Sequence, residues 1–254
     1  MRTSRRANYG IDAPDVVRNF LAIAIAAFVI GLLVERSPNP GVESFIWPAW
    51  SIAVCFAAIA VVMLLGSLVF KKWLRDKLLN ALNLSGSERV LDVGCGSGLM
   101  LIGAAKRLDA GGSAVGIDLW KSVDQSGNDP TRTLANAAAE GVAERIEIVT
   151  GDFSQIPFPD GSFDVVVSSW AIHNPKSKAV RRKAIDEIVR VLRPDGKLVI
   201  ADISCAPEYA KRLKELGARD IKTSSPNFLF VTPTLTVTAK KPYPNPAVQA
   251  RLTP

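Results

Sequence analysis

The sequence has few of the residues that build metal centres and disulfide frameworks. Its 254 residues include one histidine and three cysteines. Cys55, Cys95 and Cys205 lie far apart, without the spacing of metal ligands, and an odd number of cysteines makes a poor disulfide framework. We therefore expect no metal site, and a reducing compartment.

Signs of a nucleic-acid-binding surface are also scarce. The net charge is +7, but the basic residues flank hydrophobic segments and one later helix, without interleaved aromatic residues or an RNA-binding signature. Nucleic acid is therefore a disfavoured partner. On the later helix, a solvated face is the simpler interpretation and a surface for anionic lipid is the alternative. The basic residues of this helix are Lys176, Lys178, Arg181, Arg182 and Lys183.

Charged side chains are absent from residues 45–70. This run is longer than the roughly 20 residues that cross the hydrocarbon core of a bilayer. Trp47 and Trp50 near one end and Trp73 beyond the other suit the two membrane–water interfaces. A buried helix of a globular core is the alternative. The pattern favours a transmembrane helix over about 46–70.

A second apolar segment precedes it and predicts a span over about 16–34, provided that Arg18 extends its guanidinium toward the headgroups. A cleaved signal peptide is the alternative, because basic residues precede the segment. Residues 35–38, Glu-Arg-Ser-Pro, form no small-residue cleavage site, and another span follows directly. We therefore expect a retained membrane hairpin.

The basic residues predict the orientation of this hairpin. They precede the first span and follow the second, whereas the connecting loop carries only Arg36. Because basic residues favour the cytoplasmic side, both ends of the hairpin are expected to face the cytoplasm. The basic residues outside the loop are Arg2, Arg5, Arg6, Arg18, Lys71, Lys72, Arg75 and Lys77.

Beyond the hairpin, apolar β-runs alternate with helical periods, which is typical of a doubly wound, mostly parallel sheet. Two apolar runs near the end, 229–231 and 235–238, predict a terminal antiparallel pair. The other expected strands are 89–93, 114–118, 146–150, 163–168 and 197–203. The expected helices are 99 to about 111, 129–141, 177–192 and 207–216.

These patterns divide the chain into four parts. We expect a membrane hairpin over 1–71, an amphipathic connector over 72–84, an α/β domain over 85–241 and an irregular, Pro-rich tail over 242–254.

The most informative stretch is residues 90–98, Val-Leu-Asp-Val-Gly-Cys-Gly-Ser-Gly. An apolar strand runs into three alternating glycines, which let the backbone approach a ligand and present amide groups to it. A dinucleotide fingerprint would need a third glycine where Leu99 stands, which disfavours NAD(P). Asp118 ends the next strand about 20 residues later, where an acid can accept ribose hydroxyls.

Residues 90–98 resemble the S-adenosylmethionine (SAM)-binding signature of class I methyltransferases, and the resemblance continues in register through 115–118 and 151–153. Residues 157–169 and 191–198 are similar to the subgroup that contains ubiquinone and menaquinone C-methyltransferases, except that Asp195 replaces a glycine. The resemblance implies a Rossmann-like, seven-stranded sheet, SAM as the cofactor and methyl transfer as the activity.

The resemblance also implies a set of cofactor-binding residues. It places Asp118 at the ribose, Asp152 near the adenine amino group and Phe153 against the ring. Singly, Asp92, Asp118 and Asp152 are ordinary turn or cap residues, but their order after successive strands favours the SAM interpretation. Cys95 is expected to fill a small position, since no basic partner would activate it. The implied set is Asp92, Gly94, Cys95, Gly96, Gly98, Asp118, Leu119, Gly151, Asp152, Phe153 and Ser168.

Two assignments stay open at this stage. The only histidine, His173, follows the fourth strand and is either a general base or a residue that shapes the rim of the pocket. The stretch 120–128, with Asp124, Gln125 and Asn128, contacts either the SAM ribose or the substrate.

Together these features predict SAM-dependent methyl transfer to a small, lipophilic or membrane-associated acceptor. Between the strand that ends near Ile203 and the terminal pair there is only one short helix, 207–216, with no inserted lid, and the N-terminal addition is the membrane hairpin. SAM is made in the cytoplasm, which agrees with the expected orientation. The alternatives are a soluble small-molecule, thiol or RNA methyltransferase that is only tethered to the membrane, a non-catalytic SAM-binding scaffold, and an NAD(P)-dependent oxidoreductase.

Overall fold

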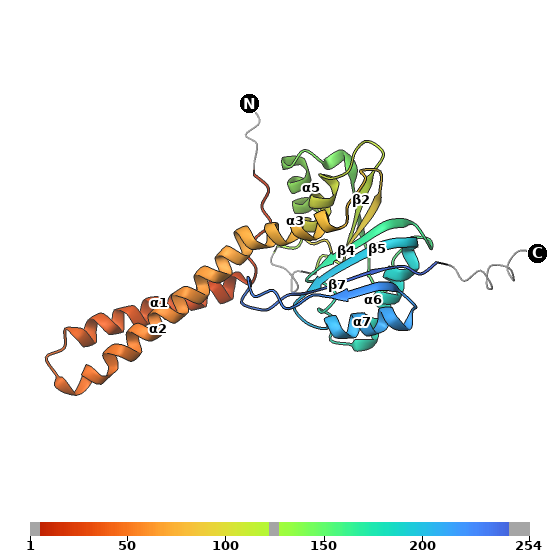
Figure 1. Ribbon diagram of the computed structural model, residues 1–254. Coiled ribbons are helices and arrows are strands. Elements are labelled where there is room, and N and C mark those ends of the chain that lie inside the picture. Colours follow the sequence, from red (N-terminus) through yellow and green to blue (C-terminus); the bar gives the residue numbers. More distant parts are fainter. Residues whose placement is uncertain (1–5, 122–126, 244–254) are drawn as a thin grey trace, which may run out of the picture. The chain divides into compact units, whose positions relative to one another are not determined.

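The computed structural model describes residues 6–121 and 127–243, which form two compact units (Figure 1). The hairpin unit consists of Gly10–Lys71 together with Phe228–Val231. The other unit, which contains the motifs that resemble a methyltransferase and is therefore called the catalytic unit, consists of the segment that ends at Tyr9, Lys72–Asn227 and the segment that begins at Thr232. The residues just before Gly10 thus group with the catalytic unit, although the sequence pattern places them with the hairpin.

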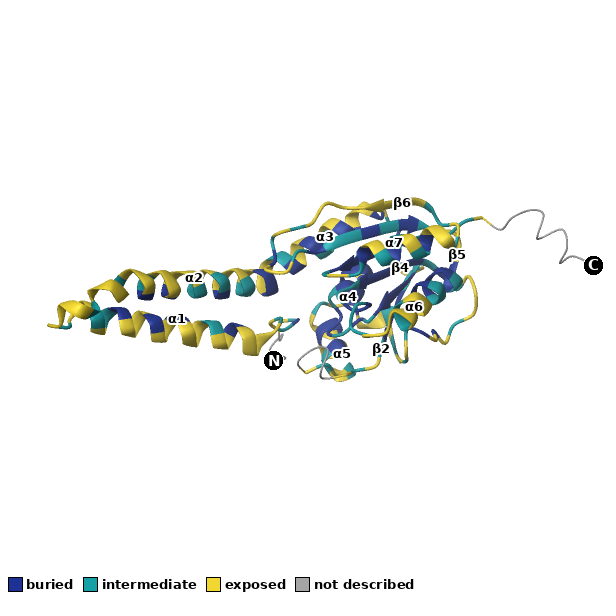
Figure 2. Cartoon of the chain, turned by 90° about the horizontal axis from the view of Figure 1, so that it is seen from below, coloured by how far each residue is buried: buried dark blue, intermediate teal, exposed yellow. Residues whose placement is uncertain are grey.

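The hairpin unit contains two long apolar helices that pack along each other, α1 (Pro14–Glu35) and α2 (Ile46–Leu65), joined by the 3-10 helix η1 (Pro40–Phe45) (Figure 1). Both helical segments are long and apolar enough to cross a membrane. Small side chains such as Ala27 and Ala53 are buried between them, while most outward side chains are exposed (Figure 2). Small residues at the interface between two helices let the helix backbones approach closely.

A cluster of polar contacts closes one end of the hairpin unit. After α2 the chain forms a π-helical turn, η2 (Gly66–Phe70). The Ser67 hydroxyl donates to Asp12 Oδ2 at 3.0 Å and accepts the Asp12 N–H at 2.9 Å. Lys71 Nζ donates to the Gly10 carbonyl at 2.7 Å. These bonds tie the start of the hairpin to its end.

The catalytic unit is built around a seven-stranded sheet in the order β3-β2-β1-β4-β5-β7-β6. β7 runs antiparallel to β5 and β6, and the other neighbours are parallel. This doubly wound arrangement confirms the predicted fold class. The strands are β1 (Arg89–Val93), β2 (Ser113–Asp118), β3 (Ile146–Thr150), β4 (Phe163–Ser169), β5 (Leu192–Asp202), β6 (Arg219–Thr223) and β7 (Leu235–Lys240).

Helices cover the sheet, so its central strands are apolar on both faces, as parallel sheets require. Val90, Leu91 and Val93 of β1 are fully buried. Asp129 caps α5 by accepting the Thr131 N–H at 2.7 Å, and α6 and α7 lie side by side (Figure 1). The helices are α3 (Lys71–Ala81), α4 (Leu99–Ala105), α5 (Pro130–Ala139), α6 (Lys178–Val191) and α7 (Ala206–Glu215), with a 3-10 turn η3 (Ala143–Arg145).

Three sequence-based expectations about the elements were wrong. Residues 229–231 form no strand; β6 is the antiparallel partner of β7, and the run 229–231 instead belongs to the hairpin unit. α4 ends at Ala105, because the chain then turns back so that the Asp109 N–H reaches the Gly86 carbonyl. β5 begins at Leu192, and the expected turn at 193–196 is a bulge within this strand.

Candidate functional site

The strand order reverses between β1 and β4, where the carboxyl ends of neighbouring parallel strands leave a crevice for a ligand. β1 continues there into a glycine loop, Gly94–Gly98. Gly94, Gly96 and Gly98 have φ values of 72°, 47° and 85°. A Cβ atom on Gly94 would lie 2.2 Å from the Cβ atom of Ala171. The loop therefore needs glycine for its backbone conformation and, at Gly94, also for space.

Asp118, at the end of β2, lies against this loop. Its Oδ2 accepts the Gly96 N–H at 2.9 Å, and its Oδ1 accepts the Trp120 N–H at 2.7 Å. Asn128 Nδ2 donates to the same Oδ1 at 3.1 Å. The structure thus brings Asp118, the glycine loop and Asn128 together. Asp124 and Gln125, which the sequence pattern also suggested for this place, lie outside the described residues.

Asp92 faces the interior of the catalytic unit. Its side chain is buried, and its Oδ2 accepts the Leu101 N–H at 2.8 Å while Oδ1 has no hydrogen-bond partner. Burial raises the pKa of Asp92 to about 8, and the negative charge of Asp118 adds to the shift. Through its hydrogen bond with the Leu101 N–H, Asp92 holds the first turn of α4 in place.

Cys95 and Ser168 also point into the protein. A Cβ atom on Gly116 would lie 2.7 Å from Cys95 Sγ, so this thiol fills the space above β2. Burial raises the pKa of Cys95, which disfavours the reactive thiolate. The Ser168 hydroxyl donates to the Val93 carbonyl at 2.8 Å and joins β4 to β1 below the glycine loop.

The remaining predicted cofactor residues follow β2 and β3. Leu119 is 37% exposed. The Gly151 N–H donates to the Asp118 carbonyl at 3.0 Å, which places the two strand ends side by side. Asp152 is exposed and its Oδ1 accepts the Ser154 N–H at 2.7 Å. Phe153 is half-buried and packs against the hydrophobic core.

His173 is paired with a buried carboxylate that the sequence pattern did not reveal. Its Nδ1 lies 2.5 Å from Oδ1 of Asp202, at the end of β5, although its N–H forms no aligned hydrogen bond. The Tyr209 hydroxyl of α7 donates to the other oxygen of Asp202 at 2.9 Å. Burial, followed by the charge of Asp202, raises the pKa of Tyr209, so this hydroxyl remains a donor. Asp202 is therefore held from one side and faces the imidazole from the other.

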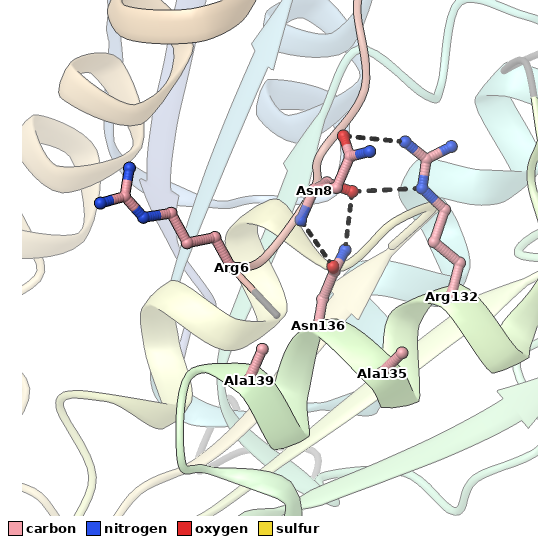
Figure 3. A pocket seen from close by; sticks show the side chains of 6 residues that line it. All are labelled: Arg6, Asn8, Arg132, Ala135, Asn136 and Ala139. Carbon is pink, nitrogen blue, oxygen red and sulfur yellow. Dashed lines mark hydrogen bonds between the residues drawn. The ribbon is translucent and has the colours of Figure 1, made fainter. Parts of the chain in front are cut away.

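The segment that ends at Tyr9 braces the glycine loop, which the sequence pattern also did not reveal. Asn136, buried on α5, donates from Nδ2 to the Ser97 carbonyl at 2.9 Å and to the Asn8 carbonyl at 3.0 Å. Its Oδ1 accepts the Asn8 N–H at 2.8 Å, and Arg132 Nε donates to the Asn8 carbonyl at 3.1 Å (Figure 3). The hollow beside this segment is lined by Arg6, Asn8, Arg132, Ala135, Asn136 and Ala139.

The charges of this site suit a cationic ligand. Among the described residues, no basic side chain forms an ion pair with Asp92, Asp118 or Asp152. Carboxylates without a basic partner, here Asp118 and Asp152, favour a nearby positive charge such as a sulfonium, and the lack of side chains on the glycines of the loop allows close approach. The residues present therefore fit SAM.

Comparisons with known proteins agree with this chemistry. A sequence-family model described as Methyltransferase domain matches residues 91–200. The chain is similar to the 27-O-demethylrifamycin SV methyltransferase of Amycolatopsis mediterranei, with 32% identity over 57% of this chain and 51% of that protein. It is 31% identical to the sterol 4-C-methyltransferase strm-1 of Caenorhabditis elegans over 57% of this chain and 40% of that protein.

A demethylmenaquinone methyltransferase of Lactiplantibacillus plantarum is 32% identical over 51% of each chain. The chain spans about half the length of the curated relatives it matches.

Solved structures show the same fold. A SAM-dependent methyltransferase from Aquifex aeolicus superposes with a TM-score of 0.50 and 21% identity, over 66% of this chain and 89% of that chain. The [4+2]-cyclase SpnF superposes with a TM-score of 0.53 and 21% identity, over 66% of this chain and 80% of that chain. Residues 91–200 therefore form a methyltransferase domain, the seven-stranded sheet around them has the class I methyltransferase fold, and the implied methyl donor is SAM.

Proposed function

We propose that this chain transfers the methyl group of SAM to a small lipophilic acceptor, while α1 and α2 anchor it in a membrane. The observation that carries the proposal is the meeting of the glycine loop with Asp118 at the point where the strand order reverses. Asp118, Leu119 and Asp152 would hold the nucleoside part of SAM, and the glycine loop would hold its amino-acid part. Asp92, Cys95 and Ser168 would support that loop from the interior.

Methyl transfer makes modest chemical demands on the protein. The sulfonium of SAM is an activated donor, so the site has to align an acceptor atom with the S–CH₃ bond and exclude water. The acceptor forms a bond to the methyl carbon, the carbon–sulfur bond breaks, and the thioether product keeps the electron pair. The acceptor also releases a proton.

His173 would take that proton. Asp202 faces Nδ1 at 2.5 Å, which favours the tautomer that carries its hydrogen on Nδ1 and leaves Nε2 free to accept. A hydroxyl acceptor needs such a base, whereas an acidic phenol or a stabilised carbanion loses its proton without much help. The pairing therefore favours an acceptor with a poorly acidic group.

The exposed apolar surface of the hairpin unit supports the membrane anchor. Ile25, Leu33 and Val54 are each more than half exposed, although water would disfavour such a surface. The basic residues at both ends of the hairpin favour a cytoplasmic catalytic unit. The printed names of two relatives, a sterol and a demethylmenaquinone methyltransferase, support a lipophilic acceptor.

A non-catalytic or differently catalytic SAM-binding protein is the second candidate, because SpnF has this fold and is named a cyclase. Calorimetry of the detergent-solubilised protein would compare binding of SAM with binding of NADH. Single-turnover assays with a membrane extract would then measure release of S-adenosylhomocysteine. Binding of SAM with turnover supports the proposal; binding without turnover supports the second candidate, and binding of NADH alone contradicts both.

A further inference from the structure

The loop between β6 and β7 has an apolar tip, Phe228–Val231, with the sequence Phe-Leu-Phe-Val. Phe228 is 74% exposed and Val231 is 51% exposed, whereas Phe230 between them is buried. Single exposed hydrophobic residues are common on proteins, but two large ones on one short tip, next to a buried aromatic ring, mark a surface that lacks its partner.

The buried member of the tip packs on the helical hairpin. A Cβ atom on Gly66 would lie 3.3 Å from Phe230 Cδ1, so the ring lies directly over the backbone of η2. The next residue, Ser67, forms the polar cluster with Asp12 at the end of the hairpin. Phe230 is therefore fixed at the level where the apolar helix becomes polar.

The helix surface at this level is itself apolar and uncovered. Leu65, Leu68 and Val69 are 42%, 54% and 50% exposed. Phe228 and Val231 belong to the same compact unit as these side chains and extend the apolar surface of the hairpin. A partner that covers the tip and this end of the hairpin must have an apolar layer next to a polar layer. The boundary between the acyl chains and the headgroups of a membrane has these two layers.

We propose that the tip Phe228–Val231 inserts into the cytoplasmic leaflet of the membrane, beside the end of α2, as a third point of membrane contact. This inference rests on the proposed membrane anchor. Asn227 and Thr234 close the stem of the loop through two backbone hydrogen bonds, of 2.8 and 3.1 Å.

The stem also leads to the candidate site. Trp170 follows β4, and its Nε1 donates to Thr234 Oγ1 at 3.2 Å. Trp170 has a φ of 53°, a left-handed conformation that is costly for a residue with a Cβ atom. A tip held by lipid would thus stabilise the stem to which Trp170 is hydrogen-bonded.

Depth-dependent quenching tests this proposal on the full-length protein in vesicles of phosphatidylcholine and phosphatidylglycerol. All proteins carry Cys205→Ser, and the buried Cys95 is retained. An NBD fluorophore on Cys55 reports the hairpin. With Cys55→Ala added, fluorophores on Phe228→Cys and Val231→Cys report the tip, and one on Lys214→Cys, an exposed position of α7, is the aqueous control.

We expect spin-labelled lipids to quench Cys55 most strongly from deep positions and both tip labels most strongly from positions near the headgroup, with little effect at Lys214→Cys. Tip labels that behave like Lys214→Cys while Cys55 is quenched would overturn the inserted tip and leave the membrane anchor intact. If Cys55 is also unquenched, both the tip and the anchor are overturned. Two tip labels guard against one substitution that disturbs the loop, and SAM binding by each variant checks its fold.

Discussion

His173 Nδ1 lies 2.5 Å from Asp202 Oδ1, while Tyr209 holds the other oxygen of the same carboxylate. The three residues come from the loop after β4, from the end of β5 and from α7. Asp202 is 1% exposed, and the hydrogen bond from Tyr209 holds the carboxylate in place beside the imidazole. This arrangement supports the proposed role of His173 as the base, which its sequence context alone left open.

Replacing His173 by alanine should lower kcat by roughly 10²- to 10⁴-fold, the usual contribution of a general base, with little change in the Kd for SAM. Asp202→Asn should also lower kcat, because an amide supports the imidazole less well. Tyr209→Phe is the matched control: it removes a hydrogen bond from Asp202 but leaves the contact with His173, so kcat should stay near the native value. A fully active His173→Ala protein would mean that His173 only shapes the rim.

Asp118→Ala should weaken SAM binding by about 10- to 100-fold, which corresponds to a lost charged hydrogen bond. Asp109→Ala provides the control, because Asp109 is an exposed aspartate whose Oδ1 likewise accepts the N–H of a glycine, Gly111, at 2.9 Å. Calorimetric titration with SAM measures both. Equal affinities of the two variants would remove Asp118 from the cofactor site.

Gly94→Ala should destabilise the catalytic unit far more than Gly141→Ala. Both glycines have nearly the same positive φ, 72° and 73°, so both substitutions introduce about 1 kcal/mol of backbone strain. The new Cβ atom would meet Ala171 at 2.2 Å in the first case and nothing within 4 Å in the second. Thermal unfolding with and without SAM compares the two variants. A similar decrease of Tm in both would show that the glycine loop can accommodate a Cβ atom at Gly94.

Asp92 should make the stability of the catalytic unit fall with rising pH. The folded protein keeps the Asp92 proton up to about pH 8, whereas the unfolded chain loses it near pH 4. Between these values the folded state binds more protons, so its free energy of unfolding decreases as the pH rises.

Asp92→Asn keeps an acceptor for the Leu101 N–H but cannot ionise. As the pH rises from 5 to 8, the free energy of unfolding of this variant should increase relative to that of the native protein, by on the order of a few kcal/mol. Chemical unfolding at several pH values measures the difference. A difference that is independent of pH would show that Asp92 is already ionised in the folded protein.

Asn136→Ala should release the segment that ends at Tyr9 from the glycine loop, because one side chain bonds to both Asn8 and Ser97. We expect faster tryptic cleavage after Arg6 and SAM binding that is weaker by several-fold, in line with the loss of one or two hydrogen bonds. Leu134→Ala on the exposed face of the same helix should change neither. Unchanged cleavage in Asn136→Ala would show that other contacts hold the segment.

The strands and the glycine loop could be predicted because their signals are local. Burial on both faces makes β1 a continuous apolar run, and the backbone conformation after it admits little but glycine. The position of Asp118 could be predicted for a similar reason, because it ends a strand and therefore lies at the edge of the sheet. The fold and the cofactor class were therefore readable from the sequence.

The parts of the structure that could not be predicted depend on contacts between residues that are distant in the sequence. Asp202 meets His173 only because β5 lies next to β4, and a strand-end aspartate carries no sign of its partner. Asn136 had only a weak sequence signal, a polar residue three positions after Thr133 on an amphipathic helix, and its burial is seen only in the structure. The run 229–231 has strand-forming residues, but packing of Phe230 on Gly66 overrides their local preference.

The most direct test of the account is the fate of the methyl group. The detergent-solubilised protein is incubated with SAM labelled in its methyl group and with a membrane extract, and label is measured in the organic, aqueous and protein fractions. We predict label in the organic fraction that is lost with Asp118→Ala and kept with Asp109→Ala. Label confined to the aqueous or protein fraction would contradict a lipophilic acceptor, and no transferred label in any fraction would contradict the proposed methyl transfer.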